Sequence, residues 1–349
     1  MQRYTRRDAV ETLGAAVAGG LVAGSWWGVQ AQTPARPRPR VIRALAADLD
    51  PATLRGPVLF HEHLSMRFPL DAAAHFTDDV ALMTEEARAA KADGLSLIVD
   101  GGHPDMHRSL DALTRITRDS GLPVVASGGY YMQRSYPAEL DAQSADDIAA
   151  RLADDARRDR LGAFGEIGQQ GGVLTLTETK VLQAVARAHT LTRLPIFTHN
   201  PYLGTRPGAA DIPREAALRQ LDVLEGAGAV SASVAIGHVC CLHDPKAEVA
   251  VAIARRGAYV GFDRVTLALL PDADKVIAVM ALVEAGHADR VLLSSDFASA
   301  RSLKKNGGAG LAQTVTVFGP MLLKAGLQAA TLRGILEDNP RRFLAFAPA

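Results

Sequence analysis

The sequence has few cysteines, few aromatic residues and no net charge. Only two of its 349 residues are cysteines, and aromatic residues make up 5%. Cys240 and Cys241 are neighbours, and Cα atoms joined by a trans peptide lie about 3.8 Å apart, below the usual disulfide range. We therefore expect two reduced, buried thiols and no disulfide framework. Basic and acidic residues number 38 each, so the charge gives no reason to expect binding to nucleic acid or to an anionic membrane surface.

A small-molecule partner is the remaining expectation, and the composition suits a large globular protein. Hydrophobic residues make up 48% of the chain, which is enough apolar material for the core of one large domain. Neither an internal repeat nor a change in composition interrupts the chain after about residue 45. We predict a single domain over residues 46–349.

The N-terminus has the features of a targeting segment. Arg6 and Arg7 are followed by a glycine- and alanine-rich apolar stretch and by a small-residue cleavage site ending at Ala31. Residues 1–31 resemble a twin-arginine export signal, and the apolar stretch is too short to predict a stable membrane span. Cleavage would give a periplasmic or exported protein, with an uncleaved anchor as the alternative. Residues 32–45 are rich in Pro and Arg and predict an extended linker.

Strand and helix patterns alternate along the rest of the chain. Alternation repeated eight times favours an α/β fold of the (β/α)8 TIM barrel type over an open doubly wound sheet. The predicted strands are 58–63, 95–100, 123–127, 162–167, 195–199, 233–238, 258–262 and 291–295. The predicted helices are 78–92, 106–120, 144–159, 177–190, 213–226, 245–256, 272–285, 311–324 and 331–343.

Several of these strands finish in a side chain that can bind a metal. In the first strand, His61 and His63 are two residues apart, so an extended backbone turns both imidazoles to the same face. Since the C-terminal ends of barrel strands meet at one face, we expect such side chains to converge despite their separation in sequence. The candidate metal ligands are His61, His63, Glu166, His199, His238 and Asp296.

The donor types point to a binuclear site. Imidazole and carboxylate donors suit zinc and its neighbours in the first transition row, and two adjacent cations need a bridging carboxylate. Glu166 lies between glycines in Gly165-Glu166-Ile167-Gly168, so the backbone could approach the metals closely. The alternatives are an ordinary strand-end turn at Glu166 and a solvated pair at His61 and His63.

At the level of motifs, the chain from about Pro51 to its C-terminus resembles the phosphotriesterase family of the amidohydrolase superfamily, in the branch of phosphotriesterase homology proteins. Taken together, the matching stretches are specific. They are His61-Glu62-His63-Leu64, Gly128-Gly129-Tyr130-Tyr131, Gly165-Glu166-Ile167-Gly168, Thr198-His199, Gly237-His238, Ser295-Asp296, Asn306-Gly307-Gly308 and Asp338-Asn339-Pro340-Arg341-Arg342-Phe343.

The resemblance implies roles for the candidate ligands. His61, His63 and Asp296 would hold the more buried of two divalent ions, and His199 and His238 the more exposed one. Glu166 would bridge them, whereas the best-known phosphotriesterases use a carboxylated lysine that this chain lacks between Lys91 and Lys180. Zinc is the expected metal, with manganese, cobalt or iron as alternatives. Homodimers are common in the family, so a homodimer is a possible assembly.

A second departure from the best-known members concerns the substrate pocket. Arg264 occupies the place of a histidine that organophosphate-hydrolysing members carry, and Cys241 the place of an acidic residue. Arg264 resembles its counterpart in lactonase-like members, and Tyr131 matches a tyrosine lining the same pocket, so both are candidate substrate-binding residues. The alternative is a surface position for Arg264 and a packing role for Tyr131.

The expected function is hydrolysis by a hydroxide held between two metals. Asp296 is the candidate catalytic residue, which would accept the proton of the attacking water and relay it to the leaving group. A lactone or other carboxylic ester is the first candidate substrate, an N-acyl amide the second and a phosphotriester the third. A single-metal hydrolase with a structural Glu166, and a metal-containing binding protein, are the other readings of the same residues.

Overall fold

The structure is a computed structural model of the chain that describes residues 39–67, 77–201, 213–242, 244, 246–266, 270–299 and 302–348. The predicted export signal, residues 1–31, lies outside the described residues. Within these ranges, no helix has both the length and the apolar character needed to cross a bilayer.

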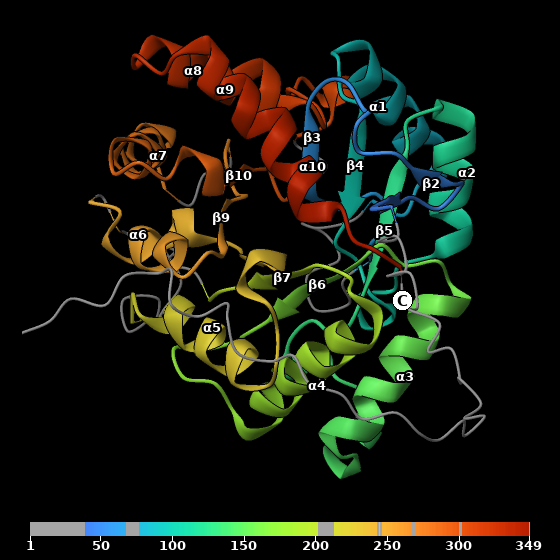
Figure 1. Cartoon of the computed structure of the whole chain (residues 1–349). Helices are drawn as coiled ribbons and strands as arrows, with labels where there is room; N and C mark the ends of the chain where they lie inside the picture. Colours follow the sequence, from blue (N-terminus) through green and yellow to red (C-terminus); the bar gives the residue numbers. More distant parts are fainter. Residues whose placement is uncertain are drawn as a thin grey trace, which may run out of the picture. The chain divides into compact units, whose positions relative to one another are not determined.

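Eight parallel strands form one sheet, and each pairs with the strand that follows it in sequence. Every strand is buried along its whole length, as expected for a parallel sheet covered on both faces. All eight predicted strands are confirmed, with ends that differ by a residue or two (Figure 1). The strands are β3 (Val58–Glu62), β4 (Leu97–Asp100), β5 (Val124–Gly128), β6 (Ala163–Gly168), β7 (Ile196–His199), β8 (Val234–Ile236), β9 (Tyr259–Phe262) and β10 (Val291–Leu293).

Strands β3 and β10, the first and last of the sheet, meet and close it. The backbone N–H groups of Phe60 and His61 both donate to Ser294 Oγ, at 2.9 and 3.0 Å. The N–H of Asp296 donates to the carbonyl of His61 at 3.2 Å. These contacts complete the predicted (β/α)8 barrel.

Helices follow the strands and surround the barrel (Figure 1). Two of them begin with reciprocal capping boxes, Ser144 with Asp147 and Thr175 with Glu178, which satisfy the free N–H groups of the first turn. The helices are α1 (Val80–Ala92), α2 (Leu110–Ser120), α3 (Ala145–Arg158), α4 (Leu176–Thr192), α5 (Ala216–Gly226), α6 (Glu248–Arg255), α7 (Asp272–Glu284), α8 (Gly319–Lys324), α9 (Ala329–Arg333) and α10 (Asn339–Leu344).

The last two predicted helices are each interrupted by a π-helical turn. The turn Thr314–Phe318 precedes α8, and the turn Gly334–Asp338 lies between α9 and α10. Pro320 and Pro340 are the second residues after these turns. A proline has no N–H and its ring clashes with the carbonyl four residues earlier, so the helix widens where it approaches each proline.

Apolar side chains form separate layers inside and outside the barrel. In β3, Leu59 packs outward among the helices, whereas Val58 and Phe60 face the interior. The interior combines aliphatic side chains with aromatic rings, and Phe343 of α10 meets Phe60 edge-on at 6.2 Å between ring centroids. The opposite, C-terminal end of the strands is left for polar side chains.

The expected start of the domain near residue 46 is wrong. Ile42 and Ala44 are 1% exposed, and the strand β1 (Ile42–Arg43) pairs antiparallel with β2 (Asp48–Leu49). Val41 also forms a bridge with Phe346. The folded unit therefore begins within the segment 32–45 that composition assigned to the linker, because a few apolar residues at the end of that segment pack against the barrel.

Candidate metal centre

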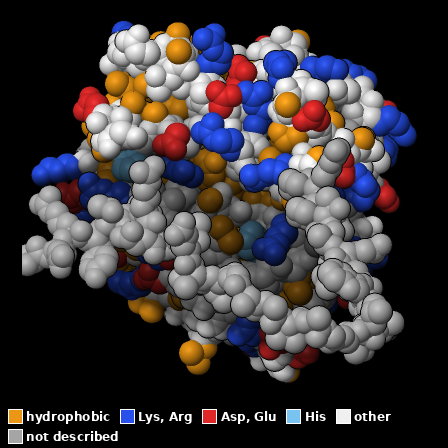
Figure 2. Space-filling model, in the orientation of Figure 1, with side chains coloured by type: hydrophobic (Ala, Val, Ile, Leu, Met, Phe, Trp, Pro, Cys, Tyr) orange, Lys and Arg blue, Asp and Glu red, His pale blue; other side chains and the backbone are white. Residues whose placement is uncertain are grey.

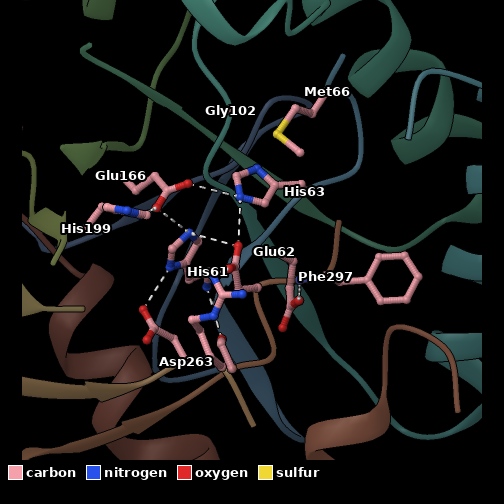
Figure 3. Close-up of polar contacts among 12 residues, drawn as sticks. His61, Glu62, His63, Met66, Gly102, Glu166, His199, Asp263 and Phe297 are labelled. Carbon is pink, nitrogen blue, oxygen red and sulfur yellow. Dashed lines mark hydrogen bonds and ion pairs between the residues drawn. The ribbon is translucent and has the colours of Figure 1, made fainter. Parts of the chain in front are cut away.

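The strand ends bring all six candidate ligands into one buried cluster. They extend from β3, β6, β7 and the segments after β8 and β10. The four histidines are at most 2% exposed, Glu166 is 1% exposed and Asp296 is 8% exposed. Figure 3 shows Glu166 facing His61, His63 and His199. The convergence that the sequence predicted is therefore present.

Glu166 lies at the centre of this cluster. Its Oε2 is 2.7 Å from His199 Nδ1, 3.4 Å from His61 Nε2 and 3.5 Å from His238 Nε2. Its Oε1 is 3.2 Å from His63 Nε2. One carboxylate thus reaches all four imidazoles, with its two oxygens turned to different members of the set.

The donor atoms divide into groups that share Glu166. His61, His63, Glu166 and Asp296 form one group, and Glu166, His199 and His238 form another, with the donor atoms of each group within 4.8 Å of one another. Asp296 Oδ1 is 3.1 Å from His63 Nε2. His61 and His238 also form a third such group with Asp263.

A local irregularity of β3 aims its two histidines. The pairing register with β4 shifts between Leu59 and Glu62, and Ser294 Oγ accepts the N–H groups of two consecutive residues, Phe60 and His61. An extra residue in a strand reverses the face of every residue after it. His61 and His63 consequently join Phe60 inside the barrel, while Glu62 points away toward Phe297 (Figure 3).

Glycines around Glu166 make room for neighbouring groups. A Cβ on Gly165, whose φ is 151°, would lie 2.3 Å from the Phe197 ring, and a Cβ on Gly168 would lie 2.1 Å from the carbonyl of Tyr131. The peptide bond between Gly165 and Glu166 is cis. Glycine is thus required on both sides of Glu166, because a side chain at either position would clash with β7 or with the loop after β5.

Two of the candidate ligands have a left-handed backbone. His238 has φ 56° and Asp296 has φ 50°, a region that costs non-glycine residues on the order of 1 kcal/mol or more. Such strain persists where the surroundings fix the residue. The carboxylate of Asp263 fixes the backbone of His238, because it accepts the His238 N–H at 2.6 Å.

Asp263 is the main site residue that the sequence analysis missed. It is fully buried, accepts the Nδ1–H of His61 at 2.8 Å and accepts the Nδ1–H of His238 at 3.0 Å. These bonds turn the Nε2 atoms of both histidines toward Glu166. The signal was available, because Asp263 directly follows the apolar run of β9 just as the six candidate ligands follow theirs.

Other buried polar residues hold the ligand-bearing backbone. Asp100 Oδ2 accepts the N–H of Leu64 at 2.7 Å, which fixes the chain after His63. Gln220 Nε2 donates to the carbonyl of His199 at 3.0 Å. Glu62 Oε1 and Oε2 accept the N–H groups of Ser295 and Phe297, on either side of Asp296. Asp100 ends the apolar run of β4 and so carries the same sequence signal as Asp263, whereas Gln220 and Glu62 carry no such signal.

The charges of this cluster favour a bound cation. Burial lowers the pKa of His63 and of His238, but hydrogen bonds and charges of the neighbouring carboxylates outweigh burial and raise both to about 9. His199 differs, since burial dominates and lowers its pKa to about 4. Burial would raise the pKa of Asp296, yet the Arg264 charge and the His63 hydrogen bond lower it to about 2. Carboxylates that hold protons on buried imidazoles would equally hold metal ions in their place.

The donors fit divalent metals of the zinc type. Donor atoms of one group lie about 3 to 4 Å apart, as expected for atoms that share a cation about 2.0 to 2.2 Å away. His61 Nε2 is buried and has no hydrogen-bond partner. Its other nitrogen is held by Asp263, which is the usual arrangement of a metal-binding histidine oriented by a carboxylate. The residues that could hold metal are His61, His63, Glu166, His199, His238 and Asp296.

Both candidate substrate residues lie beside this cluster. Arg264 is 8% exposed, and its Nη1 is 2.8 Å from Asp296 Oδ2. The Tyr131 ring meets the His199 ring edge-on, with centroids 4.9 Å apart. Arg264 is therefore not a surface residue. Tyr131 also packs with Met66, Met132 and Ala298 in a small apolar cluster separate from the two cores.

The two cysteines follow His238 in the next short helical turn, Val239–Cys241. Both thiols are free and buried, with sulfurs 3.8 Å apart. This agrees with the expectation of two reduced thiols.

Comparison with known proteins identifies the family. The model of the phosphotriesterase family matches residues 42–344, nearly the whole described chain. The chain belongs to the phosphotriesterase family. It is therefore a metal-dependent hydrolase, in agreement with the buried groups that could bind metal.

This chain aligns with almost the full length of individual family members. The phosphotriesterase homology protein of Escherichia coli (strain K12) is 29% identical over 298 residues, which is 82% of this chain and 97% of that protein. Its crystal structure, with phosphate in the active site, superposes with a TM-score of 0.76 over 83% of this chain and 99% of that one at 28% identity.

Two further members differ in what they act on or bind. An N-acetyltaurine hydrolase of Rattus norvegicus is 27% identical over 354 residues, 87% of this chain and 98% of that protein. The structure of a resiniferatoxin-binding protein from Rhodobacter sphaeroides has a TM-score of 0.77 at 28% identity, over 88% of this chain and 96% of that one. Membership in the family thus establishes the fold and the class of reaction. It does not establish which molecule this chain acts on.

Proposed function

We propose that this hydrolase uses two divalent metal ions, with zinc as the expected metal, to cleave a small-molecule lactone or other carboxylic ester. The observation that carries the proposal is the single carboxylate of Glu166 within 3.5 Å of an imidazole nitrogen of each of four histidines. His61, His63 and Asp296 would hold one ion, His199 and His238 the other, and Glu166 both. Bound divalent cations supply an acidified water and polarise the attacked oxygen.

The protein's own groups would manage the proton and the leaving group. Asp296, whose pKa of about 2 keeps it ionised at neutral pH, would accept the proton of the attacking water and transfer it to the leaving oxygen. Glu166 and the histidines fix the geometry. Tyr131 and the apolar cluster around Met66 would contact the acyl part of the substrate and exclude water.

Arg264 favours an ester over an amide. Its guanidinium is 2.8 Å from Asp296, so it would lie beside the leaving group that Asp296 protonates. A departing alkoxide carries developing negative charge that a fixed cation stabilises. An amine leaves as a neutral molecule and gains less from that cation.

A second candidate, hydrolysis of an N-acyl amide, rests on one observation. The rat relative, 27% identical over 87% of this chain, is an N-acetyltaurine hydrolase. Phosphotriester hydrolysis ranks third, because Arg264 and Cys241 replace two groups of the phosphotriesterase proton relay. The resiniferatoxin-binding protein supports the remaining alternative, a metal-containing binding protein.

A substrate panel with an Arg264 variant tests the proposal. Zinc-loaded protein is given lactones, linear carboxylic esters, N-acyl amides including N-acetyltaurine, and phosphotriesters, and kcat/KM is measured. We expect the highest values for lactones or esters, and Arg264→Met should lower ester turnover on the order of 100-fold while leaving metal content unchanged. Faster turnover of amides would favour the second candidate, and absence of turnover with metal bound would favour the binding protein.

A further inference from the structure

A cavity lies outside the barrel, separate from the candidate metal centre. Its volume is about 620 Å³, and it is bounded by the segments that follow β4 and β5 and by helix α3. Small-molecule sites commonly span about 300 to 1,000 Å³. All its lining residues belong to the range 104–161, and none of the six candidate metal ligands is among them.

The chain after β5 separates this cavity from the metal centre. Tyr130 lines the cavity, whereas the next residue, Tyr131, packs its ring against His199. Asp105 lines the cavity as well, and its Oδ2 accepts the N–H of Tyr131 at 2.9 Å. The cavity and the metal centre thus lie on opposite sides of one stretch of backbone and would bind separate molecules.

Four arginines and four acidic residues line the cavity, but most of the acidic charge is already used. Arg158 Nη2 is 2.8 Å from both Asp155 Oδ1 and Asp159 Oδ2. Asp105 Oδ2 also accepts the hydroxyl of Ser135 at 2.9 Å. Glu139 is exposed to solvent. Asp105 keeps one buried oxygen, Oδ1, without a hydrogen-bond partner, whereas the other three carboxylates are satisfied within the protein or by water.

Two of the arginines lack a carboxylate partner. Among the described residues, no carboxylate oxygen lies within 4.0 Å of the guanidinium of Arg108 or of Arg151. Arg108 donates from Nε and Nη2 to the carbonyls of Gly102 and Ser127, at 3.3 and 3.1 Å. Backbone carbonyls satisfy the hydrogens but do not neutralise the charge. Burial lowers the pKa of Arg108, which is the mark of a poorly hydrated cation.

Arg151 is the less satisfied of the two. Its guanidinium lies over the Tyr130 ring, 5.6 Å from the centroid. Its Nε and Nη2 are buried and have no hydrogen-bond partner. Buried guanidinium nitrogens without partners are rare in folded proteins and are commonly completed by a bound group.

We propose that this cavity is a second binding site, which takes a small organic anion bearing a carboxylate or a phosphate. Arg108 and Arg151 would supply the positive charge, since guanidinium groups recognise both kinds of anion. Tyr130, Pro137, Leu152 and Leu161 line the same space and suit the apolar body of the molecule. The site is independent of the proposed hydrolysis.

Titration calorimetry of the metal-loaded protein with benzoate and with inorganic phosphate tests this site. We expect a binding event that survives metal chelation, and Arg151→Met should weaken it on the order of tenfold or more. Arg219→Met, an exposed arginine on α5, is the matched control and should leave it unchanged. Tighter binding of benzoate identifies the carboxylate as the ligand class, and tighter binding of phosphate identifies the phosphate.

A second variant distinguishes a specific loss of anion binding from a loss caused by misfolding. Asp155→Asn removes an acidic group from the cavity wall, so it should tighten anion binding, which a damaged protein would not do. The proposal is overturned if no anion binds to the chelated wild type, if Arg151→Met binds as the wild type does, or if Asp155→Asn fails to bind more tightly.

Discussion

At the scale of single residues, the account depends on how each imidazole is oriented. His61 and His238 offer Nε2 to the cluster because the carboxylate of Asp263 holds the Nδ1 of each. Burial would raise the pKa of Asp263, but its two imidazole partners hold it well below its usual range. His61 would bind one of the two proposed ions and His238 the other. Asp263 therefore orients one candidate ligand of each ion.

Asp263→Asn tests this positioning role. An amide has one acceptor oxygen in place of two, so it cannot hold both Nδ1–H groups, and we expect metal affinity to fall about 10- to 100-fold. The measurement is a competition titration of zinc against a chromophoric chelator. Asp222→Asn, an exposed substitution on α5, is the control. Equal affinity of Asp263→Asn and wild type would show that the histidines are oriented by packing alone.

The same residues show what the sequence could and could not supply. The six candidate ligands were predictable because each follows an apolar run, and the barrel brings such positions together. Asp263 follows the same rule at the end of β9, but the family resemblance assigned no role to it. Asp100 also ends an apolar run, that of β4, but its contacts with backbone N–H groups, like those of Gln220 with a backbone carbonyl, form only in the folded chain.

At the scale of elements, the junctions between helices and strands carry buried polar contacts. His189, near the end of α4, is 2% exposed. Its Nδ1–H donates to the carbonyl of Leu194 at 2.6 Å, just before β7 begins. Its Nε2 accepts the N–H of Val230 at 3.5 Å. This pair of contacts requires the neutral ring, because a protonated Nε2 cannot accept.

The titration of His189 predicts part of the pH dependence of stability. Burial lowers the pKa of His189 in the folded state, so the unfolded chain takes up its proton at higher pH. Its contribution to stability is complete above the unfolded pKa of about 6.5 and is lost as the pH falls below that value. In metal-free protein, the free energy of unfolding should therefore fall more between pH 7.5 and 5.5 in wild type than in His189→Gln. Urea titrations at the two pH values measure this, and an equal fall in both proteins would contradict it.

The sequence predicted the barrel strands but not the two-residue strands or the π-helical turns. All eight barrel strands were predicted, because each is an apolar run next to a helical pattern. The two-residue strands β1 and β2 give no periodic signal, so the start of the fold was placed too late. The π-helical turns before Pro320 and inside the last predicted helix were also missed, since their apolar spacing resembles that of an ordinary helix.

At the scale of the whole molecule, basic and acidic residues are equal in number. On the face shown in Figure 2, basic and acidic side chains are interspersed, in agreement with 38 residues of each sign. This pattern agrees with a small-molecule hydrolase and gives no electrostatic footprint for a polyanion. The sequence could establish this much because net charge and composition do not depend on geometry.

We propose that residues 1–31 export the protein. The twin arginines Arg6 and Arg7 precede an apolar stretch and a small-residue cleavage site, and twin-arginine export would carry the folded, metal-loaded barrel. Cell fractionation should find wild type in the periplasm and the double variant Arg6→Lys, Arg7→Lys in the cytoplasm. The same distribution for both proteins would refute the proposal.

The central claim is that one carboxylate joins two metal ions, and metal content per chain tests it most directly. Elemental analysis of wild-type protein after loading with zinc and removal of free metal should give close to two equivalents. Glu166→Gln keeps the shape of the side chain but removes the bridging charge, so it should retain one equivalent or less. One equivalent in wild type, or two in Glu166→Gln, would contradict the account.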